Sequence, residues 1–122
     1  MFFSDFVMVL IKMKRAYEPA SRSDGYRILV DRLWPRGVSH EKAALNIWVK
    51  EIAPTDKLRQ WFHKDPEKRW TEFNKRYSAE LSDNHYLKQL RQLVKSKKVV
   101  TLVYSSKSEK NNATVLARRL AR

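Results

Sequence analysis

Residues 26–37 read YRILVDRLWPRG, and this stretch says most about the fold. Its apolar first half predicts a strand over Tyr26–Asp31 that buries Ile28 and Val30. The strand leads directly into an acid, two arginines and a tryptophan, and then into a turn that contains Pro35 and Gly37. These residue types at the end of a buried strand are not typical of an ordinary solvent-exposed face. We therefore expect them to form an interaction surface or a site.

Two other strands are expected, one earlier and one later in the chain. The first covers about residues 7–15, where Val9, Ile11 and Met13 alternate with Leu10 and two lysines. The last is VVTLVY, residues 99–104, a continuous apolar run that is typical of a strand buried on both faces. Residues 45–49 fit either a strand or a helix.

Helices are expected between these strands. Ser39, Thr55 and Asp65 are the predicted N-caps, and Pro66 suits the first position of a helix because its missing N–H costs nothing there. Aromatic and leucine residues then recur at helical spacing. We interpret this stripe as core rather than as a cofactor site, and it comprises Trp70, Phe73, Tyr77 and Leu81. Two further amphipathic helices are expected around residues 87–94 and 113–120.

Strands that alternate with helices predict an α/β fold: one domain over residues 8–122, with a small, mainly parallel sheet of about three strands flanked by helices. Residues 1–7 would be an N-terminal extension, either disordered or a lead-in to the first strand, and Met8 is as good a start as Met1. The apolar amino terminus lacks a preceding basic region, and no window reaches the ~20 apolar residues that span a bilayer. We therefore expect a soluble protein with no membrane partner.

The 122-residue chain carries 26 Lys and Arg against 13 Asp and Glu, a net charge of +13. This excess favours phosphate, nucleic acid or acidic lipid head groups as partners, although a merely cationic surface explains it slightly better. Cysteine is absent, which excludes disulfides, thiol nucleophiles and cysteine zinc sites. The histidines, His40, His63 and His85, show no metal-binding spacing, so neither a metal nor another cofactor is expected. The oligomeric state stays open.

The carboxyl ends of parallel strands share one edge of a sheet, where open α/β sheets bind ligands. Cationic and polar residues follow the three predicted strands, and the candidates for ligand binding are Arg15, Tyr17, Arg32, Arg36, Ser105, Lys107, Asn111 and Asn112. Lys107 is the strongest of them, because it lies between a buried strand and a helix start as phosphate-binding lysines do, although without a glycine-rich loop. For catalysis, Asp31 is a candidate base and Tyr104 or Lys107 a candidate acid.

Purely structural roles compete with these functional ones. Asp31 and Arg32 would then form an ion pair that holds the turn, Trp34 would pack on the sheet edge, and Arg36 would bind loop carbonyls. The structural role is favoured for Trp34, whereas both roles stay open for the two arginines.

Four segments together resemble the YeaO-like family, a group of small proteins with a domain of unknown function. They are KRAYEPASRSDGYRILVDRLWPRG, WVKEIAPTDKLRQWF, RWTEFNKRYSAEL and VTLVYSSKSEKNNATVL, in this order, and the likeness runs from Lys12 onward. The resemblance implies a cytoplasmic single α/β domain and supplies no activity. Family members usually show a histidine in the loop and helix start after the last strand, where this chain has Asn112 in a loop one residue shorter. Chemistry that depends on that histidine is therefore not carried over.

Three functions follow as hypotheses. The first is binding of a small phosphorylated or anionic ligand at the carboxyl edge of the sheet, with or without catalysis. The second is a nucleic-acid-binding module on the side opposite the strand ends, and it would use Lys95, Lys97, Lys98, Arg118, Arg119 and Arg122. The third is a scaffold that binds a protein partner and no ligand. Salt dependence separates the first two, because each neutralised phosphate of a nucleic acid releases counterions.

Overall fold

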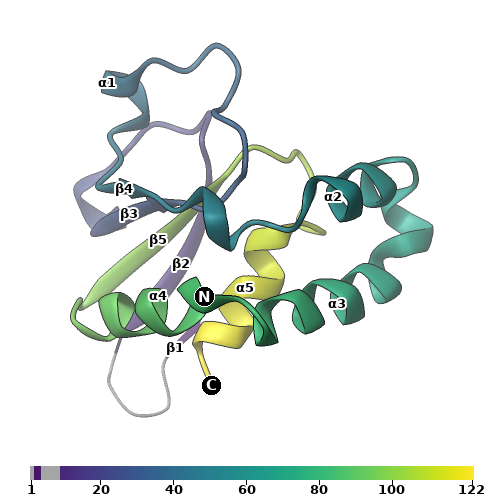
Figure 1. The fold of residues 1–122 in the computed structure, drawn as a ribbon. Helices are drawn as coiled ribbons and strands as arrows, with labels where there is room; N and C mark the ends of the chain where they lie inside the picture. The colour runs from purple at the N-terminus through teal and green to yellow at the C-terminus, as the bar shows by residue number, and fades with distance from the viewer. Residues whose placement is uncertain (1, 4–8) are drawn as a thin grey trace.

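The computed structural model describes residues 2–3 and 9–122. Most of the predicted extension over residues 1–7, and the predicted first-strand positions Val7 and Met8, lie outside the described residues. Strands and helices are interspersed along the chain (Figure 1). The strands are β1 (Phe2–Phe3), β2 (Leu10–Arg15), β3 (Tyr26–Leu29), β4 (Ile47–Trp48) and β5 (Val99–Tyr104). The helices are α1 (His40–Ala43), α2 (Asp56–His63), α3 (Pro66–Ser82), α4 (His85–Lys95) and α5 (Asn112–Leu120), with 3-10 turns at Arg22–Asp24 and Lys50–Ile52.

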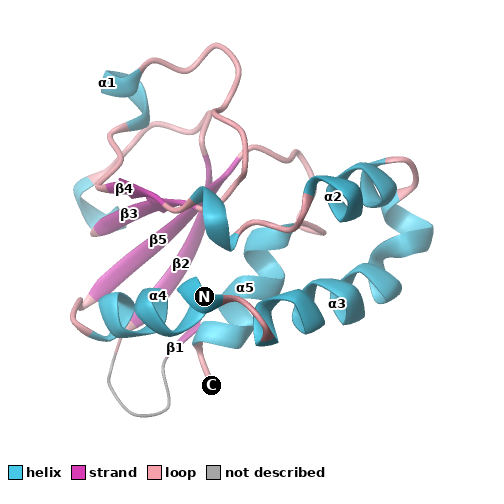
Figure 2. Cartoon of the chain, in the orientation of Figure 1, coloured by secondary structure: helices cyan, strands magenta, loops and turns pink. Residues whose placement is uncertain are grey.

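The described strands form one sheet in the order β1-β2-β5-β3-β4. β2, β5, β3 and β4 are parallel, and β1 pairs antiparallel with β2. The predicted α/β fold with a mainly parallel sheet is thus confirmed, and the three predicted strands are its central members (Figure 2). The sheet has two more strands than expected, because β1 and β4 are two residues long and too short to show a period.

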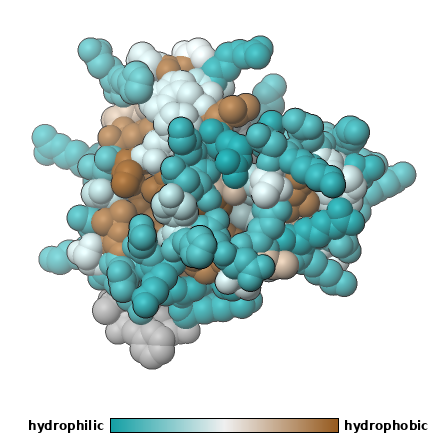
Figure 3. All heavy atoms as spheres, in the orientation of Figure 1, coloured by the Kyte–Doolittle hydropathy of each residue, from teal (hydrophilic) through white to brown (hydrophobic). Residues whose placement is uncertain are grey.

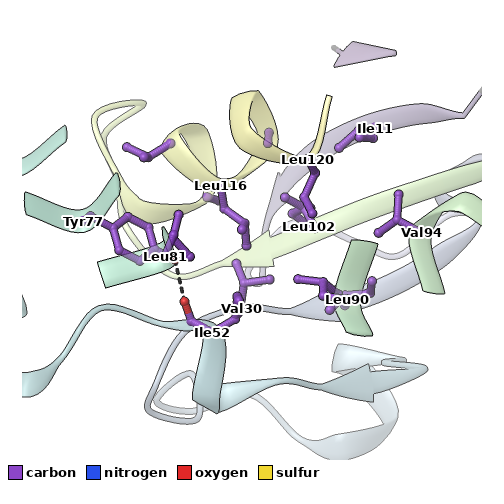
Figure 4. Close-up of a cluster of buried hydrophobic side chains, with 14 of the residues drawn as sticks. Ile11, Val30, Ile52, Tyr77, Leu81, Leu90, Val94, Leu102, Leu116 and Leu120 are labelled. Carbon is purple, nitrogen blue, oxygen red and sulfur yellow. Dashed lines mark hydrogen bonds between the residues drawn. The ribbon is translucent and has the colours of Figure 1, made fainter. Parts of the chain in front are cut away.

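Two layers of side chains cover the sheet. Ile11, Ile28 and Leu102 point to the face that packs against α2, α3, α4 and α5, where the main core lies (Figure 4). Leu29 and Val103 point to the other face, where they pack against side chains from the segment after β3. This alternation is the period-2 pattern of a strand, and it explains why residues 99–104 are apolar or β-branched on both faces.

The aromatic stripe of α3 lies in the main core, as predicted. Phe73, Tyr77 and Leu81 are buried, and Trp70 is partly buried. The Tyr77 hydroxyl donates a hydrogen bond of 2.6 Å to the Ile52 carbonyl, which satisfies its polar end inside the core (Figure 4). This contact fastens the segment before α2 to α3.

The predicted helix caps are all formed. The side chains of Ser39, Thr55 and Asp65 accept hydrogen bonds from the backbone N–H three residues later, which begins α1, α2 and α3. Asn111 does the same for α5 by accepting from the Thr114 N–H at 3.2 Å. The last helix therefore begins at Asn112, one residue before the predicted start.

A buried ionic cluster holds the chain just before β3. Asp24 is 1% exposed and binds Arg27 at 2.6 Å and Lys14 at 3.0 Å. Burial alone would raise the pKa of Asp24, but hydrogen bonds from the Ser21 N–H, Lys14 and Arg27 outweigh it and hold the pKa below the ordinary value of 3.8. Arg27 also donates two hydrogen bonds to the Ala43 carbonyl. The cluster thus joins β2, β3 and α1.

The outer surface is mainly hydrophilic on the face drawn in Figure 3, with apolar patches between the charged groups. No helix within the described part of the chain is both long and apolar enough to cross a membrane.

Candidate functional site

A cleft of about 310 Å³ lies at the carboxyl edge of the sheet. Its wall comes from residues 31–36 after β3, residues 53–54 before α2, one face of α2, residues 105–106 after β5, and residues 111–112 at the start of α5. Tyr17 and Phe73 complete it. Its volume is at the lower end of the usual range for small-molecule sites, roughly 300–1,000 Å³.

Most of the predicted ligand-binding residues meet in this cleft. Its lining includes Tyr17, Arg32, Arg36, Ser105, Asn111 and Asn112. Arg15 and Lys107 are not part of the lining. Arg15 instead donates to the carbonyls of Ser106 at 2.9 Å and Ser105 at 3.4 Å, so it braces the loop after β5. Lys107 is exposed on that loop.

Asp31 is the predicted catalytic candidate that lines the cleft. Its Oδ1 accepts a hydrogen bond of 3.1 Å from Asn112 Nδ2, and its Oδ2 accepts one of 2.9 Å from the Ser105 N–H. Burial raises the pKa of Asp31, and these two donors oppose the rise without cancelling it. Tyr104 and Lys107, the candidate acids, lie outside the lining, so the cleft does not enclose the proposed acid and base together.

Asp31 and Arg32 do not form the ion pair that the purely structural alternative would require. Asp31 is bound by the loop after β5 and by α5, whereas Arg32 donates to the carbonyls of Pro54 at 3.1 Å and Ala53 at 3.2 Å. The Nε of Arg32 also lies 3.9 Å from Asp56 Oδ1. Asp31 thus connects the end of β3 to the loop after β5 and to α5, whereas Arg32 connects it to the segment before α2.

Trp34 packs on the sheet, as its structural role predicts. Its ring joins the Leu29 and Val103 cluster and lies edge-on to Trp48, with 5.6 Å between ring centroids. Its Nε1 donates a hydrogen bond of 2.7 Å to the Val38 carbonyl, and the residue also lines the cleft.

Arg36 is exposed at the cleft. Its backbone carbonyl accepts a hydrogen bond of 2.9 Å from the Tyr17 hydroxyl. The expected bonds from its guanidinium to loop carbonyls are not formed among the described residues. The structure thus leaves this side chain at the rim.

Two residues of α2 belong to the cleft although the sequence did not single them out as ligand contacts. Arg59 and His63 are four residues apart, so they lie on the same face of the helix. Arg59 Nη2 is 3.5 Å from Asp56 Oδ1, while Arg59 Nε is buried without a hydrogen-bond partner among residues 9–122. The four-residue spacing of Arg59 and His63 could have indicated this shared face. The same spacing is expected of any helix that packs its apolar residues, here Leu58 and Phe62, into the core.

His63 is within electrostatic reach of a guanidinium and a carboxylate of the cleft, those of Arg59 and Asp31. Burial lowers its pKa, the Arg59 charge lowers it further, and the Asp31 charge opposes both. His63, Arg59 and Asp31 are therefore electrostatic neighbours. Within the described part of the chain, no group of three His, Cys, Asp or Glu side chains is placed to hold a metal ion.

The residues predicted for nucleic-acid binding are not part of the cleft lining, and they lie at or just after the carboxyl ends of α4 and α5: Lys95, Lys97, Lys98, Arg118, Arg119 and Arg122. Lys97 Nζ lies over the Tyr26 ring at 4.3 Å. Arg119 donates to the Ser78 carbonyl at 3.1 Å and to Ser82 Oγ at 2.7 Å, so it links α5 to α3. Arg118 is exposed.

Comparison with known proteins places the whole described domain in one family. The family model described as "Inactive DUF488-N3 subclade" matches residues 10–122. The uncharacterized protein YeaO of Escherichia coli is 47% identical over 109 residues, which cover 88% of this chain and 93% of that protein. Uncharacterized proteins of Mycobacterium tuberculosis and Mycobacterium bovis are 40% identical over 111 residues, or 90% of this chain and 92% of theirs. No solved structure matches significantly. The chain therefore belongs to the YeaO-like DUF488 family and matches its subclade described as inactive.

Proposed function

We propose that this protein binds a small anionic ligand, best a phosphorylated metabolite, in the cleft at the carboxyl edge of the sheet. The buried Arg59 Nε, which has no acceptor among the described residues, is the observation that carries the proposal. A buried donor left without a partner costs about 1–3 kcal/mol. Because the ion pair of Arg59 with Asp56 is long and the Asp56 side chain is 61% exposed, the guanidinium can turn toward a ligand at little cost.

The charges around Arg59 support an anion rather than a cation. Arg32 Nε and Arg59 Nη2 lie 3.9 Å and 3.5 Å from the same oxygen of Asp56, so two guanidinium groups share one carboxylate. Arg36 adds a third guanidinium at the rim. Guanidinium groups match the oxygens of phosphate and carboxylate with paired, charge-assisted hydrogen bonds.

Binding without turnover fits this cleft better than catalysis. The family that matches residues 10–122 is described as inactive. In the cleft, Asp31 is held by the amide of Asn112, which cannot exchange a proton at neutral pH, and neither Tyr104 nor Lys107 lines the same space. We therefore propose that the role of the cleft is recognition.

The test is calorimetric titration and thermal shift with inorganic phosphate and sugar phosphates at low and high salt. Arg59→Met should weaken phosphate binding at least tenfold, because it removes a guanidinium and keeps a long apolar side chain. Arg118→Met is the matched control: it removes the same charge from an exposed position on α5, and it should bind as the unmodified protein does.

Three results would contradict the proposal. One is an equal effect of the two variants, which would indicate only the loss of general charge. Another is the absence of any phosphate or sugar-phosphate binding. The third is binding of oligonucleotides alone, lost at high salt and weakened by Arg118→Met, which would support the nucleic-acid hypothesis instead.

A further inference from the structure

We propose that the ligand is a nucleoside monophosphate, with its phosphate at Arg59 and Arg32 and its base at Asp31; this inference rests on the proposed anion-binding function. The cleft has three kinds of surface that a single ligand would have to satisfy. They are a cationic wall, a fixed carboxylate and an apolar wall.

The carboxylate of Asp31 argues against a bare phosphate. An ionised carboxylate has about four acceptor positions. Asn112 Nδ2 and the Ser105 N–H use two of them and fix the orientation of the group, and a hydrogen bond from the Ser105 side chain also helps to lower its pKa. A negative group in an anion-binding cleft repels the ligand unless the ligand brings its own N–H or O–H donors. Nucleobases present such donors on their edges.

The apolar wall adds a requirement for a flat or ring-shaped body. Trp34, Pro35 and Phe62 contribute to the lining together with Leu33, which is 60% exposed, and inorganic phosphate gains nothing from contact with these apolar groups. Flat aromatic rings gain from such walls through burial and stacking. A volume of about 310 Å³ is room for roughly ten waters at about 30 Å³ each, far more than one phosphate group needs.

Arg59 and His63 line the cleft from the same face of α2. Arg59 contributes the cationic end, and His63, one turn later, is close enough to feel the charges of both Arg59 and Asp31. His63 lines the same cleft as Arg59 and Asp31, and its ring nitrogens can bind hydroxyl groups of a ligand that those two residues hold. A phosphate, a ribose and a base match these three groups.

The experiment measures dissociation constants of the full chain for AMP, GMP, CMP, UMP, ribose 5-phosphate and inorganic phosphate at one salt concentration. At least one nucleotide should bind ten or more times tighter than ribose 5-phosphate. Equal affinities for every nucleotide and for ribose 5-phosphate would overturn the inference, and they would leave the anion site itself intact. A 5′-phosphorylated tetranucleotide that binds tighter than every mononucleotide would also overturn it.

The variant Asp31→Asn tests the inference a second time, because it should change the affinities for the nucleotide and for inorganic phosphate in opposite directions. It should weaken the preferred nucleotide at least tenfold and strengthen inorganic phosphate severalfold, because it removes the acceptor charge that reads the base and repels bare anions. Loss of both ligands would contradict the assigned role of Asp31. Asp83→Asn, on the exposed end of α3, is the charge-matched control. Arg59→Met should weaken the nucleotide and phosphate alike, and if it weakens neither, the proposed anion site fails as well.

Discussion

Asp31 is a partly buried carboxyl whose environment links its protonation to the stability of the fold. Burial raises its pKa above the ordinary value of 3.8, despite hydrogen bonds from Asn112 and the Ser105 N–H. Between pH 3.8 and the raised value, the folded protein keeps the Asp31 proton while the unfolded chain has lost it. Stability from this group must therefore fall as pH rises through that window and level off above it.

Asp31→Asn should remove this pH dependence. The unfolding free energy of the unmodified protein minus that of the variant is expected to decrease from pH 3.8 upward and then become constant. Urea unfolding of both proteins at steps of half a pH unit measures the difference, in which the contributions of the other carboxyls cancel. Two parallel pH profiles would show that Asp31 has no raised pKa in the folded state.

For single residues, the sequence predicted which residues line the cleft better than it predicted their hydrogen-bond partners. Asp31, Arg32 and Asn112 were recognised because they follow strands, and parallel strands bring their ends together. The same rule favoured Lys107. Arg15 donates hydrogen bonds to the Ser105 and Ser106 carbonyls of the loop after β5, and the Lys107 side chain lies on the exposed surface of that loop. Arg59 was missed because the helical pattern that places it beside Phe62 is identical for a packing helix and for a binding wall.

Among the elements, the start of β3 depends on one glycine. Gly25 has φ +63°, and a Cβ at this position would lie 2.4 Å from the Val99 carbonyl oxygen of the neighbouring strand. With ψ −132°, its backbone is in a region that is essentially restricted to glycine. The close approach allows β3 to pair with β5 directly after the turn.

Gly25→Ala should therefore destabilise the fold by more than about 2 kcal/mol, from strained backbone at about 1–3 kcal/mol together with overpacking against β5. Gly37→Ala is the control, because Gly37 has φ +77° but nothing lies within 4 Å of its Cβ position. It should cost only about 1–2 kcal/mol. Chemical denaturation of the two variants measures the difference between their unfolding free energies. Equal losses of unfolding free energy would show that the contact with Val99 adds nothing.

The elements themselves were largely predictable, since long periodic segments carry their own signal. Thr55, Asp65 and Pro66 marked helix starts that the structure confirms, because cap chemistry is local. β4 was not predictable: two residues show no period, and Ile47–Trp48 is a strand because Asn46 and Val49 bond to the backbone of β3. Such pairing depends on the neighbouring strand, not on the segment.

For the whole molecule, the net charge of +13 is the dominant long-range property. It creates self-repulsion in the compact state, and dissolved ions screen it with a Debye length of about 10 Å at 0.1 M. The melting temperature should therefore rise with sodium chloride between about 0.01 M and 0.15 M ionic strength. A flat profile would indicate that the carboxylates already neutralise the repulsion locally.

Sodium phosphate at the same ionic strength separates screening from site binding. Both salts screen equally, but phosphate is also excluded from protein surfaces and so stabilises any folded protein to some extent. Occupation of the cleft adds a further rise that grows as RT ln(1 + [L]/Kd). The unmodified protein and Arg118→Met should therefore show the full phosphate increment, whereas Arg59→Met should keep only the part due to surface exclusion. If all three proteins give the same increment in scanning calorimetry, the cleft does not bind phosphate, because removal of the Arg59 guanidinium, whose buried Nε has no partner among the described residues, would have to be visible there.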